Sequence, residues 1–337
     1  MHVLSHDSTA KGVVADGASF HRLERAVQFS ASDVLDPAIE IAHLLDHIWE
    51  SPLLVEDFRR LAAELRPDVV LVDHSLGSVL IEARTSPAPT GVLYHTVYGP
   101  DGRDRMVAHF SGRPLSSDPA NSFRALLESL PLVLVFSHAA FNPQTDFPPS
   151  VHHVGPIREP SAPAEWPRRY PDRPLVLVSL STSFMNQQAT LQRICDAVSS
   201  LPLEALVTTG ESVVAAELTA GENVELRAFA PHDQVLDHAD LVITHAGHGT
   251  VMAAVGAGVP LLCLPMGRDQ PGNAARVEAL GLGRVLSPAA RPGEIAAVAT
   301  AMLNDPTLGH ACRAFAAGLS RFGDLGRAAD LVEGLAP

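Results

Sequence analysis

Short apolar runs alternate with helical patterns along most of the chain. Runs such as Val69–Val72, Leu132–Phe136, Leu175–Leu180 and Leu241–Ile243 are only a few residues long, which is typical of buried strands. Between such runs apolar residues recur every three or four positions, as over Asp33–Leu65, which predicts helices with one buried face. Strands that alternate with helices predict parallel sheets covered by helices on both faces.

The alternation is interrupted once, by a proline-rich segment. Six prolines lie between Pro156 and Pro174, and no regular element tolerates that density. We therefore predict an α/β chain of two doubly wound, Rossmann-like domains facing across a cleft: residues 1–157, a linker at 158–174, and residues 175–337. In such folds ligands bind outside the carboxyl ends of the strands.

One stretch combines several ligand-binding features. Leu241–Asn273 contains a strand, the turn His245-Ala246-Gly247-His248-Gly249-Thr250, a helix and a second strand that ends in Arg268-Asp269-Gln270. Glycines allow a ligand to approach the backbone closely, and the N-terminus of the following helix attracts anions. The residues alone predict a phosphate-sized site with a carboxylate and an amide beside it.

Composition and charge narrow the functional classes. The formal charge of −14 disfavours nonspecific nucleic-acid binding, which depends on lysine and arginine. No apolar run approaches the roughly 20 residues of a membrane span, and the first residues lack the features of a signal peptide. The three cysteines are far apart in apolar contexts, as expected of buried thiols. We therefore expect a cytoplasmic protein without stable membrane insertion.

The segment Arg227–Gly283 resembles a known signature. It has an aromatic residue before proline, a His-x-Gly-x-Gly-Thr turn, Gly-Val-Pro, and Asp-Gln ahead of an Asn-Ala helix. This pattern resembles the donor-binding segment of GT-B nucleotide-sugar glycosyltransferases, in the bacterial macrolide and natural-product branch of the UDP-glycosyltransferase superfamily. Val178–Phe184 and His153–Ile157 resemble the first C-terminal strand and the linker entry of that family. The resemblance is specific from about Val151 onward.

The resemblance implies a role for each candidate donor-binding residue. The donor's phosphates would be contacted by His245, Gly247, Gly249, Thr250, Thr182 and Ser183. The nucleobase would contact Phe229 and Ala230, and the sugar hydroxyls would bind Asp269 and Gln270. The residues also allow structural alternatives. His245 could be satisfied by a carbonyl, Thr250 could cap the helix, Phe229 could belong to the core, and Asp269 and Gln270 could cap the loop.

Three positions depart from the family pattern. Ala253 stands where many members carry a glutamate that bonds the ribose hydroxyls, Ser181 replaces a usual glycine, and His232 replaces a usual glutamine. The donor could be a UDP-sugar or a dTDP-sugar. The loss at Ala253 favours a donor with fewer ribose hydroxyls, such as a dTDP-sugar, unless another residue compensates.

The N-terminal half lacks a recognisable counterpart of the family's first strand and its catalytic histidine. Asp73 lies where the family places the carboxylate that orients this base. His6, His74 or His95 could substitute, because each follows a predicted strand, and Asp73 could otherwise cap a helix. We expect an N-terminal sheet one strand short, and no histidine on Asp73 from a first-strand turn.

The sequence therefore favours an inverting glycosyltransferase that moves a sugar from a nucleoside diphosphate to a hydroxyl of a lipophilic natural product. It would need no cofactor and no metal, since the helix dipole and His245 stabilise the leaving group. A nucleotide-sugar-binding or auxiliary protein without turnover and a sugar-nucleotide epimerase are the alternatives. His43 and His47 share a helix face but lack a third metal ligand, and Asp73–Gly77 lacks the leading glycine of a nucleophile elbow. The acceptor and the oligomeric state stay open.

Overall fold

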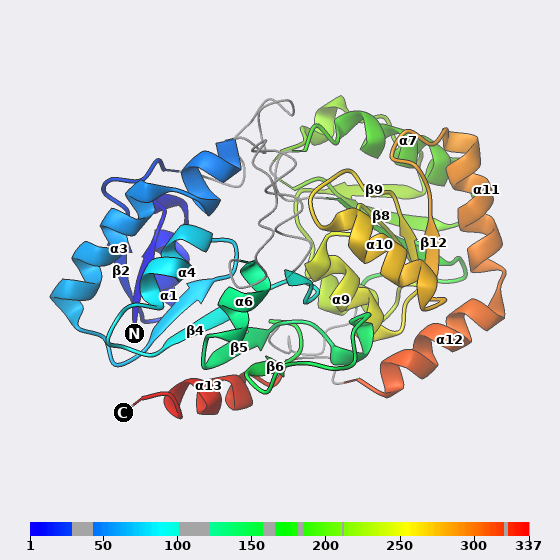
Figure 1. Ribbon diagram of the computed structural model, residues 1–337. Helices are drawn as coiled ribbons and strands as arrows, with labels where there is room; N and C mark the ends of the chain where they lie inside the picture. Colours follow the sequence, from blue (N-terminus) through cyan, green and yellow to red (C-terminus); the bar gives the residue numbers. More distant parts are fainter. Residues whose placement is uncertain are drawn as a thin grey trace. The chain divides into compact units, whose positions relative to one another are not determined.

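A computed structural model describes residues 1–28, 43–100, 122–157, 166–180, 185–210, 212–319 and 323–336. The chain forms two compact units, and the boundaries between them are crossed several times (Figure 1). Unit 1 comprises Met1–Val135, Asp146–Val154 and Leu325–Pro337, and unit 2 comprises Phe136–Thr145 and Gly155–Asp324. No helix in these ranges is both long enough and apolar enough to cross a bilayer.

Unit 1 contains short strands and helices in alternation. In chain order they are β1 (His2–Ser5), η1 (Asp7–Thr9), α1 (Ala10–Ala15), β2 (Ser19–Arg22), η2 (Leu45–Trp49), α3 (Pro52–Leu65), β3 (Val70–Asp73), α4 (Gly77–Ala83), β4 (Thr90–Tyr94), α6 (Phe123–Glu128), β5 (Leu132–Val135), β6 (Val151–His153) and α13 (Leu325–Glu333).

Unit 2 follows the same alternation. In chain order its elements are η4 (Ala139–Phe141), β7 (Leu175–Ser179), α7 (Gln188–Ser199), β8 (Glu204–Thr208), η5 (Ala215–Glu217), β9 (Val224–Arg227), α8 (His232–Leu236), β10 (Leu241–Thr244), α9 (His248–Ala257), β11 (Leu261–Cys263), α10 (Gln270–Ala279), β12 (Gly283–Val285), α11 (Pro292–Leu303) and α12 (Pro306–Ala317).

The sheet of unit 2 is parallel and doubly wound. Its strand order is β12-β11-β10-β7-β8-β9, so β7 and β10 are neighbours at the centre although they are far apart in sequence. Helices α7 and α11 pack together, and α9 contacts α8, α10 and α12, which covers the sheet in layers (Figure 1). Every residue of β7, β8 and β10 is buried, as expected of strands covered on both faces. The predicted α/β fold class is confirmed.

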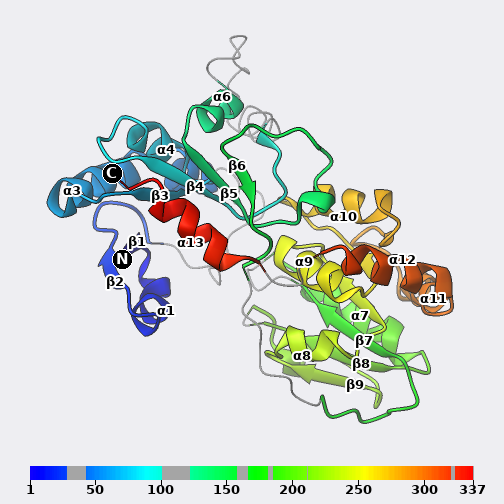
Figure 2. The same cartoon turned by 90° about the horizontal axis from the view of Figure 1, so that it is seen from below.

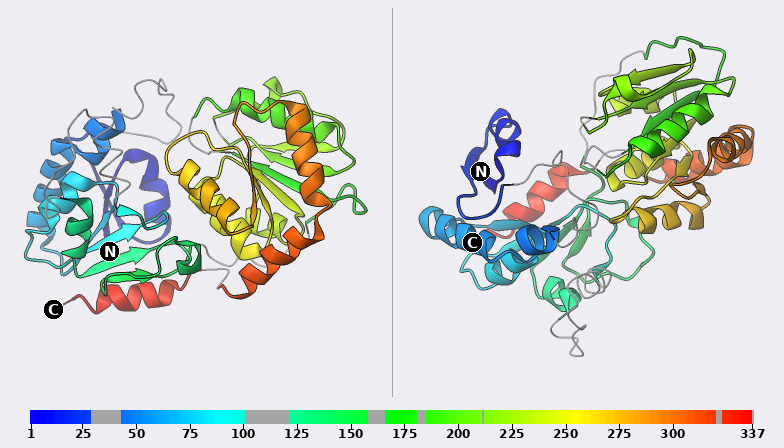
Figure 3. Two further views of the ribbon diagram at one scale, coloured as in Figure 1. Left: turned by 45° about the vertical axis from the view of Figure 1, so that its right-hand side comes forward. Right: turned by 90° about the horizontal axis from the view of Figure 1, so that it is seen from above.

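Unit 1 contains two separate parallel sheets. One has the order β3-β4-β5-β6, and the other is the pair β1-β2, which stands with α1 beside the rest of the unit (Figure 3). Valines on one face of the larger sheet, including Val72, Val92 and Val133, form a core with side chains of α3, α4 and α6, and Leu4 of β1 packs against that core. Strands β1 and β3 do not pair. The expected shortfall of one strand stays a prediction.

The helix predicted over Asp33–Leu65 is not continuous. Residues 33–42 lie outside the described part, and the rest is divided into the π-helical turn η2 and helix α3. Ser51 is extended between them, and Pro52 begins α3. Proline lacks the N–H that would continue a preceding helix, whereas at a first helical position that N–H is not needed. The apolar periodicity of the sequence did not predict this break.

The last helix belongs to unit 1, although the predicted boundary assigned residues 175–337 to one C-terminal domain. Helix α13 packs against β5 (Figure 2). Leu132 and Leu134 of β5 are almost fully buried but alternate with the valines that form the core cluster, so they face the opposite side of the sheet. An amphipathic helix that covers this second face removes their side chains from water.

We predict that Gly283→Ala destabilises unit 2. A methyl group at Gly283 would lie 2.0 Å from the carbonyl oxygen of Leu261 on the paired strand β11, and 2.8 Å from the Val277 side chain. Because backbone must shift to relieve this clash, urea denaturation should show a loss of about 2 kcal/mol or more. Gly293→Ala is the control, since nothing lies within 4 Å of its added methyl group. Equal stability of the two variants would contradict the packing described.

Candidate functional site

The candidate donor site lies where the winding of unit 2 reverses. From β7 the chain winds outward to β8 and β9, and from β10 it winds the other way to β11 and β12. The loops that follow two such central strands leave on opposite sides of the sheet and create a ligand crevice at its carboxyl edge. His245 directly follows β10. The loop after β7 holds Thr182 and Ser183, which lie outside the described residues.

His245 is a buried and neutral imidazole. Its exposed fraction is 7%, and its Nδ1 lies 3.3 Å from the Thr244 hydroxyl oxygen. Burial lowers its pKa to about 4, although the Asp269 carboxylate and the Ser179 backbone act in the opposite direction. Burial disfavours the charged imidazolium because charge is poorly solvated there. At neutral pH the ring is therefore a polar group without charge.

Gly247 is required by the position of that ring. A methyl group at Gly247 would lie 2.5 Å from Nε2 of His245, which is closer than side chains approach one another. Ala246, between the two, has a φ of +67° and donates its N–H to the Thr244 hydroxyl. Its carbonyl accepts a hydrogen bond from the Asn273 amide at 3.0 Å, so α10 helps to hold this left-handed turn.

The N-terminus of α9 opens onto the same turn. Gly247 is the N-cap and gives no side-chain hydrogen bond, and the helical ladder starts with the Val251 N–H bonded to the Gly247 carbonyl. The helix itself does not use the N–H groups of Gly249 and Thr250. Nothing lies within 4 Å of a methyl group placed on Gly249, so this part of the backbone is open to a ligand. Thr250 is not the helix cap.

Asp269 and Gln270 differ sharply in their surroundings. Asp269 is exposed, and its Oδ2 accepts a hydrogen bond of 2.9 Å from the same Asn273 amide that bonds Ala246. Gln270 is only 2% exposed, and its Oε1 accepts from the N–H groups of Met266 and Gly267. Gln270 thus supports the loop, as the structural alternative anticipates. Its predicted contact with a sugar would require these bonds to be exchanged.

Phe229 and Ala230 also differ in exposure. Phe229 follows β9 and is 80% exposed, which excludes the alternative that it is a core residue in this structure. Ala230 beside it is buried. An exposed aromatic ring at the carboxyl edge of a parallel sheet can stack on a planar group such as a nucleobase. Ala253, in the second turn of α9, is buried and offers no polar atom.

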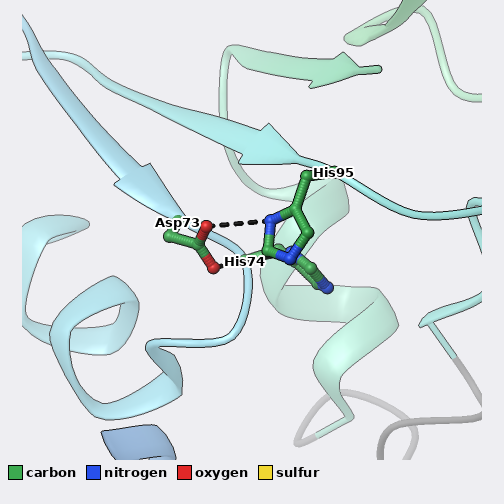
Figure 4. A group of neighbouring side chains, drawn as sticks. All are labelled: Asp73, His74 and His95. Atoms are coloured by element: carbon green, nitrogen blue, oxygen red, sulfur yellow. Dashed lines mark ion pairs between the residues drawn. The ribbon is translucent and has the colours of Figure 1, made fainter. Parts of the chain in front are cut away.

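Unit 1 brings Asp73 together with two histidines at the carboxyl ends of β3 and β4 (Figure 4). Nδ1 of His95 lies 2.9 Å from Oδ2 of Asp73, and Nδ1 of His74 lies 3.6 Å from Oδ1. Neither histidine comes from a first-strand turn. Oδ1 of Asp73 also accepts hydrogen bonds from the backbone and the hydroxyl of Ser75. The N-cap of α4 is Leu76, so Asp73 does not cap that helix.

The surroundings keep Asp73 ionised. Burial alone would raise the pKa of this carboxyl group, but the hydrogen bond from His95, the charges of His95 and His74, and the Ser75 hydroxyl together lower it below its ordinary value. A carboxylate bonded to a histidine nitrogen fixes the tautomer and orientation of the imidazole. The sequence named His95 as one of three substitutes for a missing base, and the structure places it on Asp73.

Comparison with known proteins agrees with this geometry. Residues 192–320 match the family model of the erythromycin biosynthesis protein CIII-like C-terminal domain. Demethyllactenocin mycarosyltransferase of Streptomyces fradiae is 30% identical over 65% of this chain, and oleandomycin glycosyltransferase of Streptomyces antibioticus is 33% identical over 51%. These matches span 48% and 41% of the two relatives, or about half of their length.

Solved structures resemble the chain over its whole length. The glycosyltransferase of kitacinnamycin superposes with a TM-score of 0.80 at 24% identity, covering 100% of this chain and 91% of its own. The glycosyltransferase VinC, solved in complex with dTDP, gives a TM-score of 0.70 at 18% identity, covering 99% and 92%. These likenesses establish the fold. By sequence the chain is similar to natural-product glycosyltransferases over part of its length, and its fold is that of the GT-B glycosyltransferases.

Proposed function

We propose that this protein transfers a sugar from a nucleoside diphosphate sugar to a hydroxyl group of a lipophilic natural product, with inversion at the anomeric carbon. The observation that carries the proposal is the donor turn. A buried neutral imidazole, His245, lies against Gly247 at the open N-terminus of α9, where the sheet winding reverses. Such a turn suits a diphosphate, which needs backbone N–H donors and space.

The leaving group would be stabilised without a metal ion. We infer that the N–H groups of Gly249 and Thr250 and the ring of His245 bond the diphosphate oxygens, which gain charge as the glycosidic bond breaks. Phe229 would stack on the base, and Asp269 would accept hydrogen bonds from the sugar hydroxyls. Thr182 and Ser183 keep their predicted phosphate contacts as part of the proposal.

The acceptor would be activated by a base in unit 1. We infer that His95 takes the proton from the acceptor hydroxyl while Asp73, bonded at 2.9 Å, holds the ring and stabilises the imidazolium. The oxygen then attacks the anomeric carbon as the bond to the diphosphate breaks, in one displacement. The donor-binding protein without turnover remains the competing proposal, and the presence of a histidine on Asp73 weighs against it.

A turnover assay distinguishes the two functions. The chain is incubated with dTDP- or UDP-sugars and a panel of lipophilic hydroxylated acceptors, and nucleoside diphosphate release and glycoside formation are measured. We expect acceptor-dependent release in the wild type. His95→Gln and Asp73→Asn should lower kcat about 100-fold or more while donor affinity stays within about threefold, because neither residue lies in the donor unit. Donor binding without turnover would favour the auxiliary protein.

We predict that Gly247→Ala weakens nucleoside diphosphate binding by displacing the His245 ring. The methyl group leaves no room for Nε2, so calorimetry should show an affinity at least about tenfold lower. Gly249→Ala is the matched variant, since its methyl group meets no protein atom and should leave the stability of the protein unchanged. A Gly247→Ala protein that is stable and binds like the wild type would show that His245 does not contact the diphosphate.

We predict a preference for dTDP over UDP. The buried methyl of Ala253 stands where relatives of this family carry a ribose-binding glutamate, so a 2′-hydroxyl gains no partner from this position. An unpaired hydroxyl in a closed site costs about 1–3 kcal/mol. Competitive titration should therefore show dTDP binding several-fold more tightly than UDP. Equal or reversed affinities would mean that another residue serves the ribose.

A further inference from the structure

Unit 1 brings together three side chains whose chemistry suits a metal ion, two of which the proposed transfer reaction also uses. Asp73, His74 and His95 each offer one ligand atom, and these atoms lie within 4.8 Å of one another (Figure 4). We propose that these three side chains form a binding site for one divalent transition-metal ion of the Zn²⁺ class. This goes beyond the proposed transferase function, which needs no metal.

The distances suit a shared ion. Two ligand atoms about 2.1 Å from one metal at a tetrahedral angle lie roughly 3.4 Å apart. The measured separations from the Asp73 oxygens are 2.9 Å to His95 Nδ1 and 3.6 Å to His74 Nδ1. All three ligand atoms lie within 4.8 Å of one another, so side-chain rotation would have to bring them to one centre. The ion would replace the hydrogen that His95 and Asp73 share, and His95 would then carry its proton on Nε2.

The site is built on rigid elements. Asp73 and Leu93 are paired across β3 and β4, and the His74 N–H donates to the Leu93 carbonyl at 3.0 Å. The Ser75 hydroxyl orients the Asp73 carboxylate, as outer-shell partners orient metal ligands. The His74 ring packs against the ring of Tyr94, with centroids 4.2 Å apart. These contacts limit the entropy that the ligands lose on binding.

The site is also accessible. The side chains of Asp73 and His95 are 36% and 52% exposed, so an ion can enter and water can complete its coordination. Two imidazoles and one carboxylate suit Zn²⁺, Co²⁺ or Ni²⁺, whereas Mg²⁺ prefers oxygen ligands alone. With two nitrogens in the set, the chemistry of the ligands selects a transition metal.

Other histidine pairs supply natural controls. His2 and His21 lie in contact on β1 and β2, with Nδ1 and Nε2 2.8 Å apart, and His43 and His47 have ring centroids 4.6 Å apart. Within the described ranges, the Asp73 group alone combines three ligand side chains at these distances. A third ligand and a charged oxygen should make its affinity clearly higher than that of either pair.

Cobalt spectroscopy tests the site without any enzymatic assay. Co²⁺ is titrated into the full chain, the visible absorption of the bound ion is recorded, and Zn²⁺ is added to displace it. We expect saturation at one tight Co²⁺ per chain, with no competition from Mg²⁺. His95→Ala and Asp73→Asn should each weaken binding at least about tenfold, while His21→Ala and His47→Ala bind like the wild type.

The variants also separate this proposal from misfolding and from the transferase proposal. Circular dichroism and urea denaturation check that each variant is folded, and His74→Ala provides a third, independent ligand removal. Tight binding that survives His95→Ala, or that is lost in His21→Ala or His47→Ala, would overturn the assignment. Because binding is read from the metal spectrum, an inactive protein that binds Co²⁺ refutes only the transferase, and an active one that does not refutes only the metal site.

Discussion

The parallel pairing of β7 with β10 is the constraint on which the donor unit depends. It aligns Ser179 with Thr244, so both strands end at the same edge of the sheet. The strands that follow β7 and β10 are added on opposite sides, which leaves the two following loops without a common covering helix. The turn at His245 and the N-terminus of α9 lie at this edge because the strand order puts them there. The chemistry of the turn is a consequence of topology.

Burial of the His245 imidazole in that turn keeps the ring neutral. An imidazole with 7% exposure is tolerated because it is neutral, and its pKa of about 4 expresses the cost of charging it there. Gly247 provides the room for the ring, and Ala246 adopts a left-handed conformation that costs about 1–2 kcal/mol for a residue with a Cβ. Asn273 offsets part of this cost by bonding the Ala246 carbonyl. The turn is shaped in advance of any ligand.

Local rules predicted the α/β alternation, because strand and helix periods are encoded in neighbouring residues. They did not reveal the orientation of individual side chains or the packing of distant elements. Gln270 turns inward because the N–H groups of Met266 and Gly267 are within its reach, whereas adjacent Asp269 stays exposed. Helix α13 packs on β5 because Leu132 and Leu134 need cover on their side of the sheet. The first depends on the local fold of the loop and the second on a contact between distant segments, and periodicity reports neither.

The cluster of Asp73, His74 and His95 could be predicted only in part from the positions of these residues in the sequence. Polar residues that follow adjacent parallel strands meet at one edge of the sheet, so the sequence could suggest His95 as a partner of Asp73. To choose His95 among the three candidate histidines, one must know that β3 pairs with β4. The Asp73 carboxylate stays ionised. Its Oδ2 can accept a hydrogen bond from His95 or bind a metal ion. Both would use the same lone pairs, so the proposed base and the proposed metal site could not operate together. Occupancy by a metal would therefore lower transfer by competition for His95, whereas a metal that activates a nucleophile would raise it.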